Sequence, residues 1–380
     1  MSIARERRKV FVGMSGGVDS SVTAALLLEE GYDVVGVHIK CWSPTGDCGV
    51  TDAEDARRVA EKLEIPFYVW DFEKEYKKRV VDYMIEGYRA GLTPNPDVMC
   101  NREIKFGIFL EKALRLGADY VATGHYVRLQ RTQLTTDKKL LTSSRSKNPN
   151  NQMSGVRCQV FVARDKNKDQ SYFLWTLTQK QLAHCLFPIG EYEKKEVREM
   201  ARAFKLPTAE KKDSQGICFM GHVAIEDFLK DHIPPKTGKI VTTTGDVIGE
   251  HRGVSSYTIG QRHGIRVGGT GPYYVAEKDL KTNTLVVASG SQSETLYRKE
   301  VALTDVHFIR NYQGAGAHDR LPVLARVRYR QPLFEAFLEK RGKGTWSLEF
   351  KEPQRFVAEG QSAVFYLQKG EMLGGGIITR

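Results

Sequence analysis

Hydrophobic and polar positions along the first 125 residues predict strands and helices in alternation. Short apolar runs at residues 9–13, 33–39, 67–71 and 120–123 have the length of buried strands. Apolar side chains recur at helical spacing in residues 20–30, after Thr51, in residues 72–91 and in residues 102–116. Thr51 and Glu54 are spaced as a capping box that would start the second helix. This alternation is typical of a mainly parallel sheet with helices on both faces.

The rest of the chain has a different pattern. Residues 131–157 are polar and aperiodic, which indicates an exposed loop or a long hairpin excursion, and helical spacing returns over residues 178–204. After Pro234 and Pro235, short apolar runs are separated by Gly, Asn and Asp; they occupy residues 239–243, 273–275, 284–288 and 321–329. Such runs predict a β-rich region with one or two small barrels or sandwiches.

Composition excludes several classes of protein. The chain has 380 residues, which suggests two or three domains, and its 41% apolar and 27% charged residues exclude a disordered chain. No apolar stretch approaches the ~18 residues of a membrane helix, so we expect no membrane partner. The basic N-terminus lacks the apolar segment of a secretory signal. We therefore expect a cytoplasmic protein, or a mitochondrial one if a presequence is missing from the chain.

Charge and cysteine usage point to the partner and the compartment. The formal net charge of +11 favours a polyanionic partner, with nucleic acid the first candidate. An unspecialised basic surface is the alternative. Six cysteines without a C-x-x-C pair argue against a disulfide framework or a zinc module, and fit a reducing compartment.

A glycine-rich segment after the first predicted strand is the most informative feature. It reads Gly13-Met14-Ser15-Gly16-Gly17-Val18-Asp19-Ser20. Glycines let the backbone approach a ligand, so amide groups and the helix N-terminus can hold an anion. The segment matches neither the Walker loop nor the dinucleotide fingerprint. It resembles the phosphate loop of the ATP pyrophosphatases, which implies ATP binding and adenylation of a carbonyl oxygen. That resemblance leaves open amidotransferase-type synthetases, argininosuccinate-type ligases and several tRNA-modifying enzymes.

Two cysteines are candidates for nucleophilic chemistry. Cys100 follows Asn95-Pro96-Asp97, and we expect it in the first turn of a helix that begins near Arg102, with Asp97 as a cap. A helix N-terminus favours the thiolate, although a buried structural cysteine is the alternative. Cys218 lies between Gly216 and Gly221, which suggests a mobile turn.

Together these motifs resemble the family of tRNA-specific 2-thiouridylases, which replace the C2 oxygen of the wobble uridine with sulfur. The resemblance runs nearly from end to end. Besides the phosphate loop and the two cysteine motifs, it rests on strings that begin at Ala122, Asn167, Tyr257, Arg328 and Gly360 and follow in the family's order.

The resemblance implies three domains and an ATP site. It implies a catalytic α/β domain of the adenine-nucleotide α-hydrolase type at residues 1–225 with the insertion 131–157, a small β-rich domain at 226–292 and a β-barrel at 293–380. It further implies ATP contacts at Gly13, Met14, Ser15, Gly16, Gly17, Val18, Asp19, Ser20, Ile39 and Gly124. Mg²⁺ would accompany ATP, and no metal site on the protein itself is expected.

The resemblance also implies a sulfur-transfer scheme. Cys218 would carry a persulfide, supplied by a cysteine desulfurase or a sulfur-relay protein. Cys100 would attack that persulfide, Asp97 would assist as acid or base, and AMP and pyrophosphate would leave. An iron–sulfur cluster held by both cysteines and Asp97 is the alternative, although two thiolates are fewer than clusters usually use.

Contacts to tRNA follow from the same resemblance. It implies Asn95, Pro96 and Asp97 at the target base and further contacts at His125, Lys168, Asp169, Gln170, Arg328, Tyr329 and Gln361, in tRNAs for Lys, Glu and Gln. Arg326, Arg328 and Arg330 alternate, so on a strand they would form one phosphate-contacting face. A lysidine synthetase, a 4-thiouridine enzyme and a nucleotide-gated RNA-binding module without catalysis remain alternatives.

Overall fold

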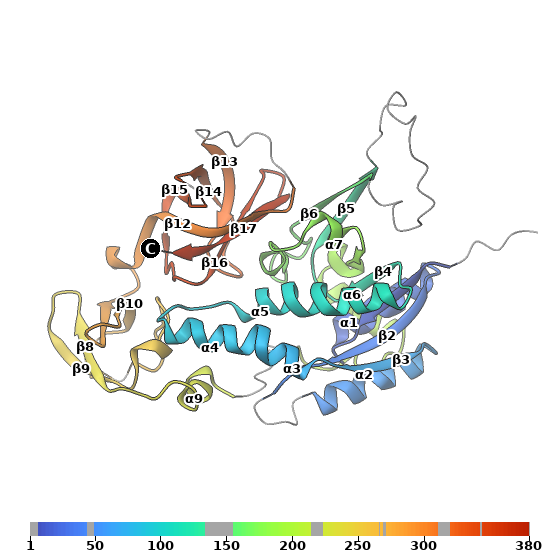
Figure 1. Cartoon of the computed structure of the whole chain (residues 1–380), viewed down its shortest axis with the longest axis horizontal. Coiled ribbons are helices and arrows are strands. Elements are labelled where there is room, and N and C mark those ends of the chain that lie inside the picture. The colour runs from blue at the N-terminus through green and yellow to red at the C-terminus, as the bar shows by residue number, and fades with distance from the viewer. Residues whose placement is uncertain are drawn as a thin grey trace, which may run out of the picture.

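The computed structural model describes residues 7–43, 49–133, 155–213, 223–265, 267–268, 271–310, 320–342 and 344–379. Figure 1 shows a parallel sheet at one end of the molecule and two β-rich units at the other. Helices α4 (Asp82–Arg89) and α5 (Pro96–Met99) lie between them. The predicted order, an α/β unit followed by a β-rich unit and a barrel, is confirmed.

The parallel sheet holds the strands that the apolar runs predict. Its order is β3 (Phe67–Asp71), β2 (Asp33–Lys40), β1 (Lys9–Gly13), β4 (Tyr120–Thr123) and β7 (Cys185–Leu186). Each neighbouring pair is parallel. Because parallel strands are buried on both faces, they read as continuous apolar runs, and this is why the prediction located them well.

Helices cover both faces of this sheet. On one face, Val10, Val12 and Val34 pack in one core cluster with helices α1 (Val18–Glu29), α2 (Val50–Lys62) and α8 (Lys194–Ala203). On the other, Phe11 and Val35 pack with α4, the π-helical segment η2 (Cys100–Ile108) and α6 (Phe109–Arg115). Alternate residues of β1 therefore face opposite cores, as a period of two requires.

Helix starts were predicted less well. The capping box at Thr51 is wrong, because α2 begins at Val50 after Gly49, whose φ is 108°. The helix expected from residue 102 begins instead at Pro96. The helical pattern of residues 72–91 is divided into α3 (Glu73–Tyr76), the π-helical segment η1 (Lys77–Val81) and α4.

The predicted excursion leaves the sheet as a hairpin. Strands β5 (Arg128–Gln133) and β6 (Val156–Phe161) pair antiparallel with each other. Residues 134–154, most of the excursion, lie outside the described residues. Beyond the hairpin come η4 (Ser171–Phe173), α7 (Gln179–Leu182) and η5 (Pro188–Glu191), which precede α8.

The β-rich region forms two units. After α9 (Ile225–Lys230), an open sheet has the order β10 (Tyr273–Asp279), β11 (Thr284–Ser289), β8 (Gly238–Thr242), β9 (Val247–His251). The short helices η6 (Val254–Ser256) and η7 (Glu294–Leu296) flank β10 and β11 along the chain. A closed barrel then follows, in the order β12 (Tyr297–Phe308), β15 (Trp346–Arg355), β14 (Phe334–Lys340), β13 (Leu321–Arg326), β16 (Ser362–Tyr366), β17 (Met372–Thr379).

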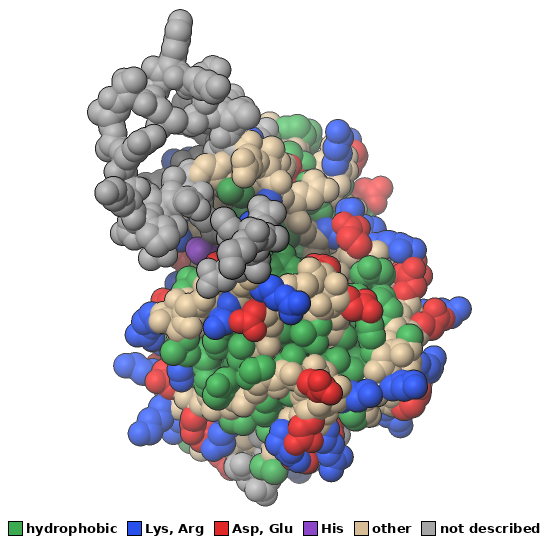
Figure 2. Space-filling model, turned by 90° about the vertical axis from the view of Figure 1, so that its right-hand side faces the viewer, with side chains coloured by type: hydrophobic (Ala, Val, Ile, Leu, Met, Phe, Trp, Pro, Cys, Tyr) green, Lys and Arg blue, Asp and Glu red, His purple; other side chains and the backbone are tan. Residues whose placement is uncertain are grey.

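The surface carries both charged and apolar side chains. Strand β3 is an edge of the sheet and leaves Tyr68 and Val69 about half exposed. Figure 2, which views the molecule from the right of Figure 1, shows hydrophobic side chains gathered among charged ones on that face. Within the described residues, no helix is both long enough and apolar enough to cross a membrane.

Candidate active site

The phosphate loop connects β1 to α1 in a conformation that requires glycine. Gly16 has a φ of 73°, and a Cβ there would lie 2.2 Å from the carbonyl oxygen of Asp52. Gly17 is the N-cap of α1, and no side chain of the described residues caps the helix. Amides of an uncapped first turn point toward solvent with the positive end of the helix dipole. The loop can therefore hold an anion.

Hydroxyl groups brace the loop from within. The amide of Ser15 donates to Oγ of Ser20 at 3.1 Å, and Oγ of Ser21 donates to the carbonyl of Gly17 at 2.8 Å. Behind the loop, the amide of Met14 donates to Val37 O on β2 at 2.7 Å. These bonds fix the loop's shape before any ligand arrives, which reduces the entropy lost on binding.

The other predicted ATP residues lie at the same edge of the sheet. Gly13 pairs with Val37 on β2 and with Thr123 on β4, so Ile39, the last residue but one of β2, and Gly124, which directly follows β4, lie at the same edge. A Cβ on Gly124 would lie 2.7 Å from the amide nitrogen of Ser20. Gly124 therefore packs directly against the first turn of α1. The structure brings together the ATP residues that the sequence predicts, at the carboxyl ends of the strands where such sheets bind ligands.

A cluster of charged side chains lies beside the loop. Oδ1 of Asp19 accepts hydrogen bonds from Tyr126 Oη at 2.8 Å and from Lys194 Nζ at 2.7 Å. Lys194 also reaches Oδ1 of Asp213 at 2.8 Å, and Asp213 further contacts Lys168 at 2.7 Å and Arg198 at 2.9 Å. We call these five residues, Asp19, Lys194, Asp213, Lys168 and Arg198, the loop cluster. Lys194, Arg198 and Asp213 were not predicted from the sequence, because no local motif marks them as site residues.

The pKa values in and around this cluster follow from its contacts. Partial burial raises the pKa of Asp213, but hydrogen bonds from Lys168 and Lys194 outweigh it and lower the value to about 2. Burial, together with the neighbouring charge of Asp19, raises the pKa of Tyr126 far above its usual range. Asp213 is therefore ionised, and Tyr126 acts as a hydrogen-bond donor throughout the physiological range.

The predicted nucleophile follows a short helix. Asn95, not Asp97, is the N-cap of α5, since Asn95 Oδ1 accepts from the amide of Val98 at 3.2 Å. Asp97 lies in the first turn, half-buried, and Cys100 directly follows the helix with only 2% of its surface exposed. Cys100 is thus the first residue of η2 and is buried in the core, rather than exposed at a free helix end.

The barrel holds the chain just before this helix. Gln361 Nε2 donates to the carbonyl of Thr93 at 2.9 Å, and the amide of Thr93 donates to Glu359 O at 2.7 Å. Gly360 lies so close that a Cβ there would meet the amide nitrogen of Thr93 at 3.0 Å. On the other side, Pro94 packs against Gly87 of α4. We call these contacts to Thr93 and Pro94 the barrel clamp.

Cys218 lies outside the described residues, since residues 214–222 are not among them. Asp213 precedes it by five positions in the sequence.

Several residues assigned to tRNA by resemblance make internal contacts here. His125 is buried between Phe106 and Phe187, and its Nδ1 lies 2.8 Å from Thr123 Oγ1. Burial, with a smaller contribution from Lys105, puts the pKa of His125 well below its usual value. The ring is therefore neutral and faces the core.

The three residues at 168–170 contact three different elements. Lys168 belongs to the loop cluster, whereas Asp169 Oδ2 pairs with Arg326 at 2.6 Å at the junction with the barrel, where both side chains are almost fully buried. Gln170 Oε1 accepts from the amide of Tyr126 at 3.0 Å. This turn thus connects the loop cluster to the barrel.

The predicted arginine face of the barrel is wrong. Strand β13 ends at Arg326, and Arg328 and Arg330 lie in the bend and turn that follow, where Arg330 has a φ of 62°. Arg326 points into the interior toward Asp169, and Arg328 donates to the carbonyl of Ile259 at 2.8 Å. Tyr329 packs against Phe173 with the rings tilted by 47° and 4.5 Å between their centroids. The three arginines therefore do not share a strand face.

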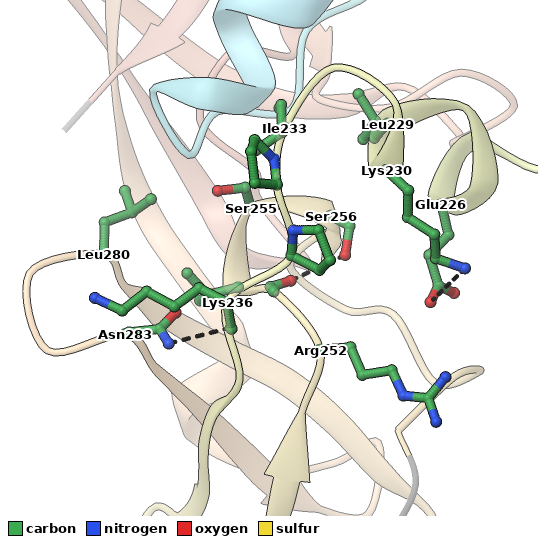
Figure 3. Close-up of a pocket in the computed structure, with 14 residues that line it drawn as sticks. Glu226, Leu229, Lys230, Ile233, Lys236, Arg252, Ser255, Ser256, Leu280 and Asn283 are labelled. Carbon is green, nitrogen blue, oxygen red and sulfur yellow. Dashed lines mark hydrogen bonds and ion pairs between the residues drawn. The ribbon is translucent and has the colours of Figure 1, made fainter.

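A hollow of about 180 Å³ lies elsewhere, between α9 and the open sheet (Figure 3). Most of its polar side chains are already engaged: Lys230 pairs with Asp227 at 2.7 Å, and Asn283 Nδ2 donates to Thr237 O at 2.8 Å. Arg252 points away from the other lining residues in Figure 3. We therefore assign no ligand to this hollow. No three His, Cys, Asp or Glu side chains in the described ranges are placed to hold a metal ion.

Three family models match successive segments that together cover most of the chain. Residues 8–222 match the family described as tRNA methyl transferase HUP domain. Residues 226–289 match the tRNA methyl transferase PRC-barrel domain, and residues 298–378 match the aminomethyltransferase beta-barrel domain.

Proteins that are similar over nearly their whole length are named 2-thiouridylases rather than methyl transferases. The chain is 45% identical to the tRNA-specific 2-thiouridylase MnmA of Bacillus licheniformis, over 98% of this chain and 95% of that protein. Its identity to the protein of the same name from Enterococcus faecalis is 46%, over 98% and 96%. Among solved structures, the U34-tRNA thiolase NcsA from Methanococcus maripaludis is 19% identical with a TM-score of 0.34, over 61% of this chain and 69% of that one. A structural similarity this low supports no argument about this chain.

Proposed function

The chain belongs to the family of tRNA-specific 2-thiouridylases, and on that premise we propose that it replaces the C2 oxygen of the wobble uridine of tRNA with sulfur, at the expense of ATP. Activation and sulfur transfer are separate steps of this reaction. The observation that carries the proposal is the phosphate loop, whose glycine-lined turn ends on an uncapped helix against Gly124.

Activation would take place at the loop. A uridine carbonyl is a poor electrophile and oxide a very poor leaving group, so adenylation converts the C2 oxygen into AMP, which leaves readily. We propose that residues 13–20 bind the phosphates, and that the backbone near Ile39 and Gly124 binds the nucleoside. Mg²⁺ would arrive with ATP and be held mainly by the phosphates, as is usual for this ion. Asp19 is the one carboxylate among residues 13–20.

Sulfur transfer would use the two cysteines. A cysteine desulfurase or a relay protein would place a sulfur atom on Cys218 as a persulfide. The Cys100 thiolate would attack the Cys218 sulfur, forming a Cys100–Cys218 disulfide and releasing hydrosulfide. Hydrosulfide would add to C2 and displace AMP, with Asp97 as the acid or base, and a thiol reductant would reopen the disulfide. We favour this over an iron–sulfur cluster because Asp97 and two thiolates make a poor cluster ligand set.

The tRNA would lie across the catalytic unit and the barrel. We propose that Asn95, Pro96 and Asp97 contact the target base, and that the half-buried Lys168, Gln170, Arg328, Tyr329 and Gln361 contact the rest of the tRNA. His125 and Asp169 are buried, so we propose that they act by holding these neighbours in place. We further propose tRNAs for Lys, Glu and Gln as substrates, and residues 1–225, 226–292 and 293–380 as the catalytic, central and barrel domains.

One reaction tests the proposal as a whole. The protein is incubated with ATP, Mg²⁺, sulfide and unmodified tRNA, and the digested tRNA is analysed for 2-thiouridine by mass spectrometry. We expect 2-thiouridine that depends on ATP. Pyrophosphate release without 2-thiouridine would favour another tRNA-modifying pyrophosphatase, and tRNA binding with neither product would favour a binding module.

Variants separate the two steps. We expect Asp19→Ala to abolish pyrophosphate release and to leave tRNA affinity nearly unchanged, because the loop does not contact RNA. Cys218→Ser should still adenylate tRNA but carry no persulfide, and Cys100→Ser should accept a persulfide but not transfer it. Cys158→Ala, at a buried cysteine of β6, is the matched control. Wild-type thiolation by Cys100→Ser with a persulfide donor would refute the two-cysteine scheme.

A further inference from the structure

Lys194 lies between two carboxylates that belong to different parts of the active site. Its Nζ is 2.7 Å from Oδ1 of Asp19, in the first turn of α1, and 2.8 Å from Oδ1 of Asp213. The Lys194 side chain is only 13% exposed, so little water competes for its ammonium group. A charge pair shielded from water is stronger than one at the surface.

The position of Asp19 creates an electrostatic conflict with a bound triphosphate. Asp19 lies in the same helical turn whose amides would receive the phosphates. A carboxylate beside phosphate oxygens repels them, and a nearby cation reduces this repulsion. Lys194 is the cation that contacts Asp19 in the described part of the chain. A triphosphate in the loop would offer that ammonium a third anionic partner.

Asp213 can lose Lys194 without becoming an unpaired charge. Lys168 Nζ lies 2.7 Å from its Oδ2, and Arg198 donates to its Oδ1 at 2.9 Å. The cluster therefore has three cations for two carboxylates, an excess of one positive charge. Asp19 likewise keeps the hydrogen bond from Tyr126. Transfer of Lys194 to a phosphate thus leaves both carboxylates with partners.

We propose that Lys194 is a further phosphate-binding residue of the ATP site, and that Asp213 competes with the triphosphate for its ammonium group. This inference rests on the proposed function, since it takes ATP as the ligand of the loop. Because the two interactions share one ammonium, ATP binding weakens the contact between Lys194 and Asp213, and that contact weakens ATP binding by the same factor. Asp213 therefore sets the ATP affinity below the value that the loop alone would reach.

The chain around Asp213 is tied to the other side of the loop as well. Lys211 Nζ contacts Asp52 at 2.7 Å and Asp55 at 2.6 Å, both on α2. The carbonyl of Asp52 is the atom that excludes a Cβ from Gly16. Residues 211–213 are thus held at both flanks of the phosphate loop, so Asp213 stays within reach of Lys194 when a ligand binds.

The test measures ATP binding to the full-length chain by calorimetry, with Mg²⁺ and without tRNA. Adenosine is the ligand that lacks phosphates. We expect Lys194→Met to weaken ATP binding about tenfold, the effect of losing one charged hydrogen bond, and to leave adenosine binding unchanged. Lys194→Arg should restore most of the affinity. Lys195→Met, which removes the same charge at the exposed next position of α8, should bind ATP like the wild type.

The distinguishing variant is Asp213→Asn. Removal of the competing carboxylate should tighten ATP binding by about threefold or more, and the gain should vanish in the double variant Lys194→Met/Asp213→Asn. A gain that persists in the double variant would assign the effect to Lys168 and Arg198 and overturn the role of Lys194. Equal ATP affinity for Lys194→Met and Lys195→Met would also overturn the role of Lys194. If the wild type still thiolates tRNA in that case, the proposed function stands. A wild-type chain that binds no ATP would refute both.

Discussion

Lys168 and Asp169 are adjacent in the sequence but belong to two charged sites with different surroundings. Lys168 belongs to the loop cluster, where each side chain that surrounds Asp213 is 13–30% exposed. Asp169, the next residue, pairs with Arg326 in a site where both side chains are no more than 4% exposed. The loop cluster has more cations than carboxylates and includes Asp19 of the phosphate loop, whereas the Asp169–Arg326 pair has one charge of each sign and is shielded from solvent.

The difference shows that burial, more than residue type, separates a ligand-binding charge from a structural one. Around Asp169, Ser171 Oγ and the amide of Ala163 complete the hydrogen bonding at 3.0 Å each, and Tyr366 also contacts Arg326 at 2.7 Å. No oxygen of Asp169 is left for a ligand. Polar residues in a family motif can therefore be retained for packing between domains as well as for contact with tRNA.

The largest effect should come from breaking the buried pair. Asp169→Ala leaves the guanidinium of Arg326 uncompensated in the interior, which typically costs about 3–5 kcal/mol. We expect the midpoint of urea unfolding to fall accordingly. The double variant Asp169→Leu/Arg326→Met should recover much of this loss, since apolar side chains of similar volume replace buried pairs well. A loss below about 1 kcal/mol for Asp169→Ala would show that the site admits water.

The buried His125 is neutral and belongs to no ion pair in the described residues, and it should make the free energy of unfolding depend on pH. The pKa of His125 is lowered on folding, so the unfolded chain binds a proton that the folded chain does not. Stability from this group is complete above the unfolded pKa of about 6.5 and falls as the pH decreases below it, by at most about 1.4 kcal/mol per pH unit. Urea unfolding between pH 7.5 and 5.5 measures the slope. His125→Gln should flatten it, and an unchanged slope in this variant would assign the effect to other histidines, such as His38 and His251.

The barrel clamp should show a smaller effect, mainly on catalysis. Gln361→Ala removes the donor to Thr93 O, which we expect to cost about 1 kcal/mol of stability and to lower kcat several-fold. Gln361→Glu should be worse, because a carboxylate cannot donate to a carbonyl. Thiolation at saturating tRNA, together with the tRNA Kd, distinguishes the roles. A raised Kd with an unchanged kcat would leave Gln361 with the proposed tRNA contact alone and would contradict its role in positioning α5.

The smallest effect should come from an exposed ion pair of the barrel. Lys351 and Glu335 lie 2.6 Å apart, with more than half of each side chain exposed. Exposed pairs usually contribute less than about 1 kcal/mol. Lys351→Ala should therefore leave the urea midpoint nearly unchanged. A loss as large as that of Asp169→Ala would contradict the conclusion that burial decides the energetic value of these pairs.

The sequence predicted best what short segments determine. The strands at residues 9–13 and 120–123 were located at their exact ends, because buried parallel strands are continuous apolar runs. The edge strand at residues 67–71 was also located at its exact ends, although it is mostly exposed. The phosphate loop was recognised because its backbone conformation needs glycine at fixed positions. Helix starts were missed where the start depends on a backbone turn, as at Gly49, or on an early proline, as at Pro96.

What the sequence could not predict depends on pairing across long separations. Lys194 is 175 residues from Asp19, and Arg326 is 157 residues from Asp169. No local pattern marks Lys194 as different from Lys195, or Arg326 as different from Arg328. The residues of each pair differ in their place in the fold, which a local pattern does not reveal. This is why Arg326 and Arg328 were predicted to share a face.

The barrel clamp has a consequence for the order in which the protein is made. Gln361 lies 268 residues after Thr93, and Ile378 of strand β17, which bonds the backbone of Gly360 and Gln361, comes later still. Domains generally fold from the N-terminus as the ribosome releases them. The phosphate loop is therefore synthesised long before the barrel contacts to Thr93 can form. On the proposed function, a nascent chain that ends before the barrel would present the phosphate loop while α5, the short helix before Cys100, still lacks its barrel contacts, so that ATP binding would precede the ability to transfer sulfur.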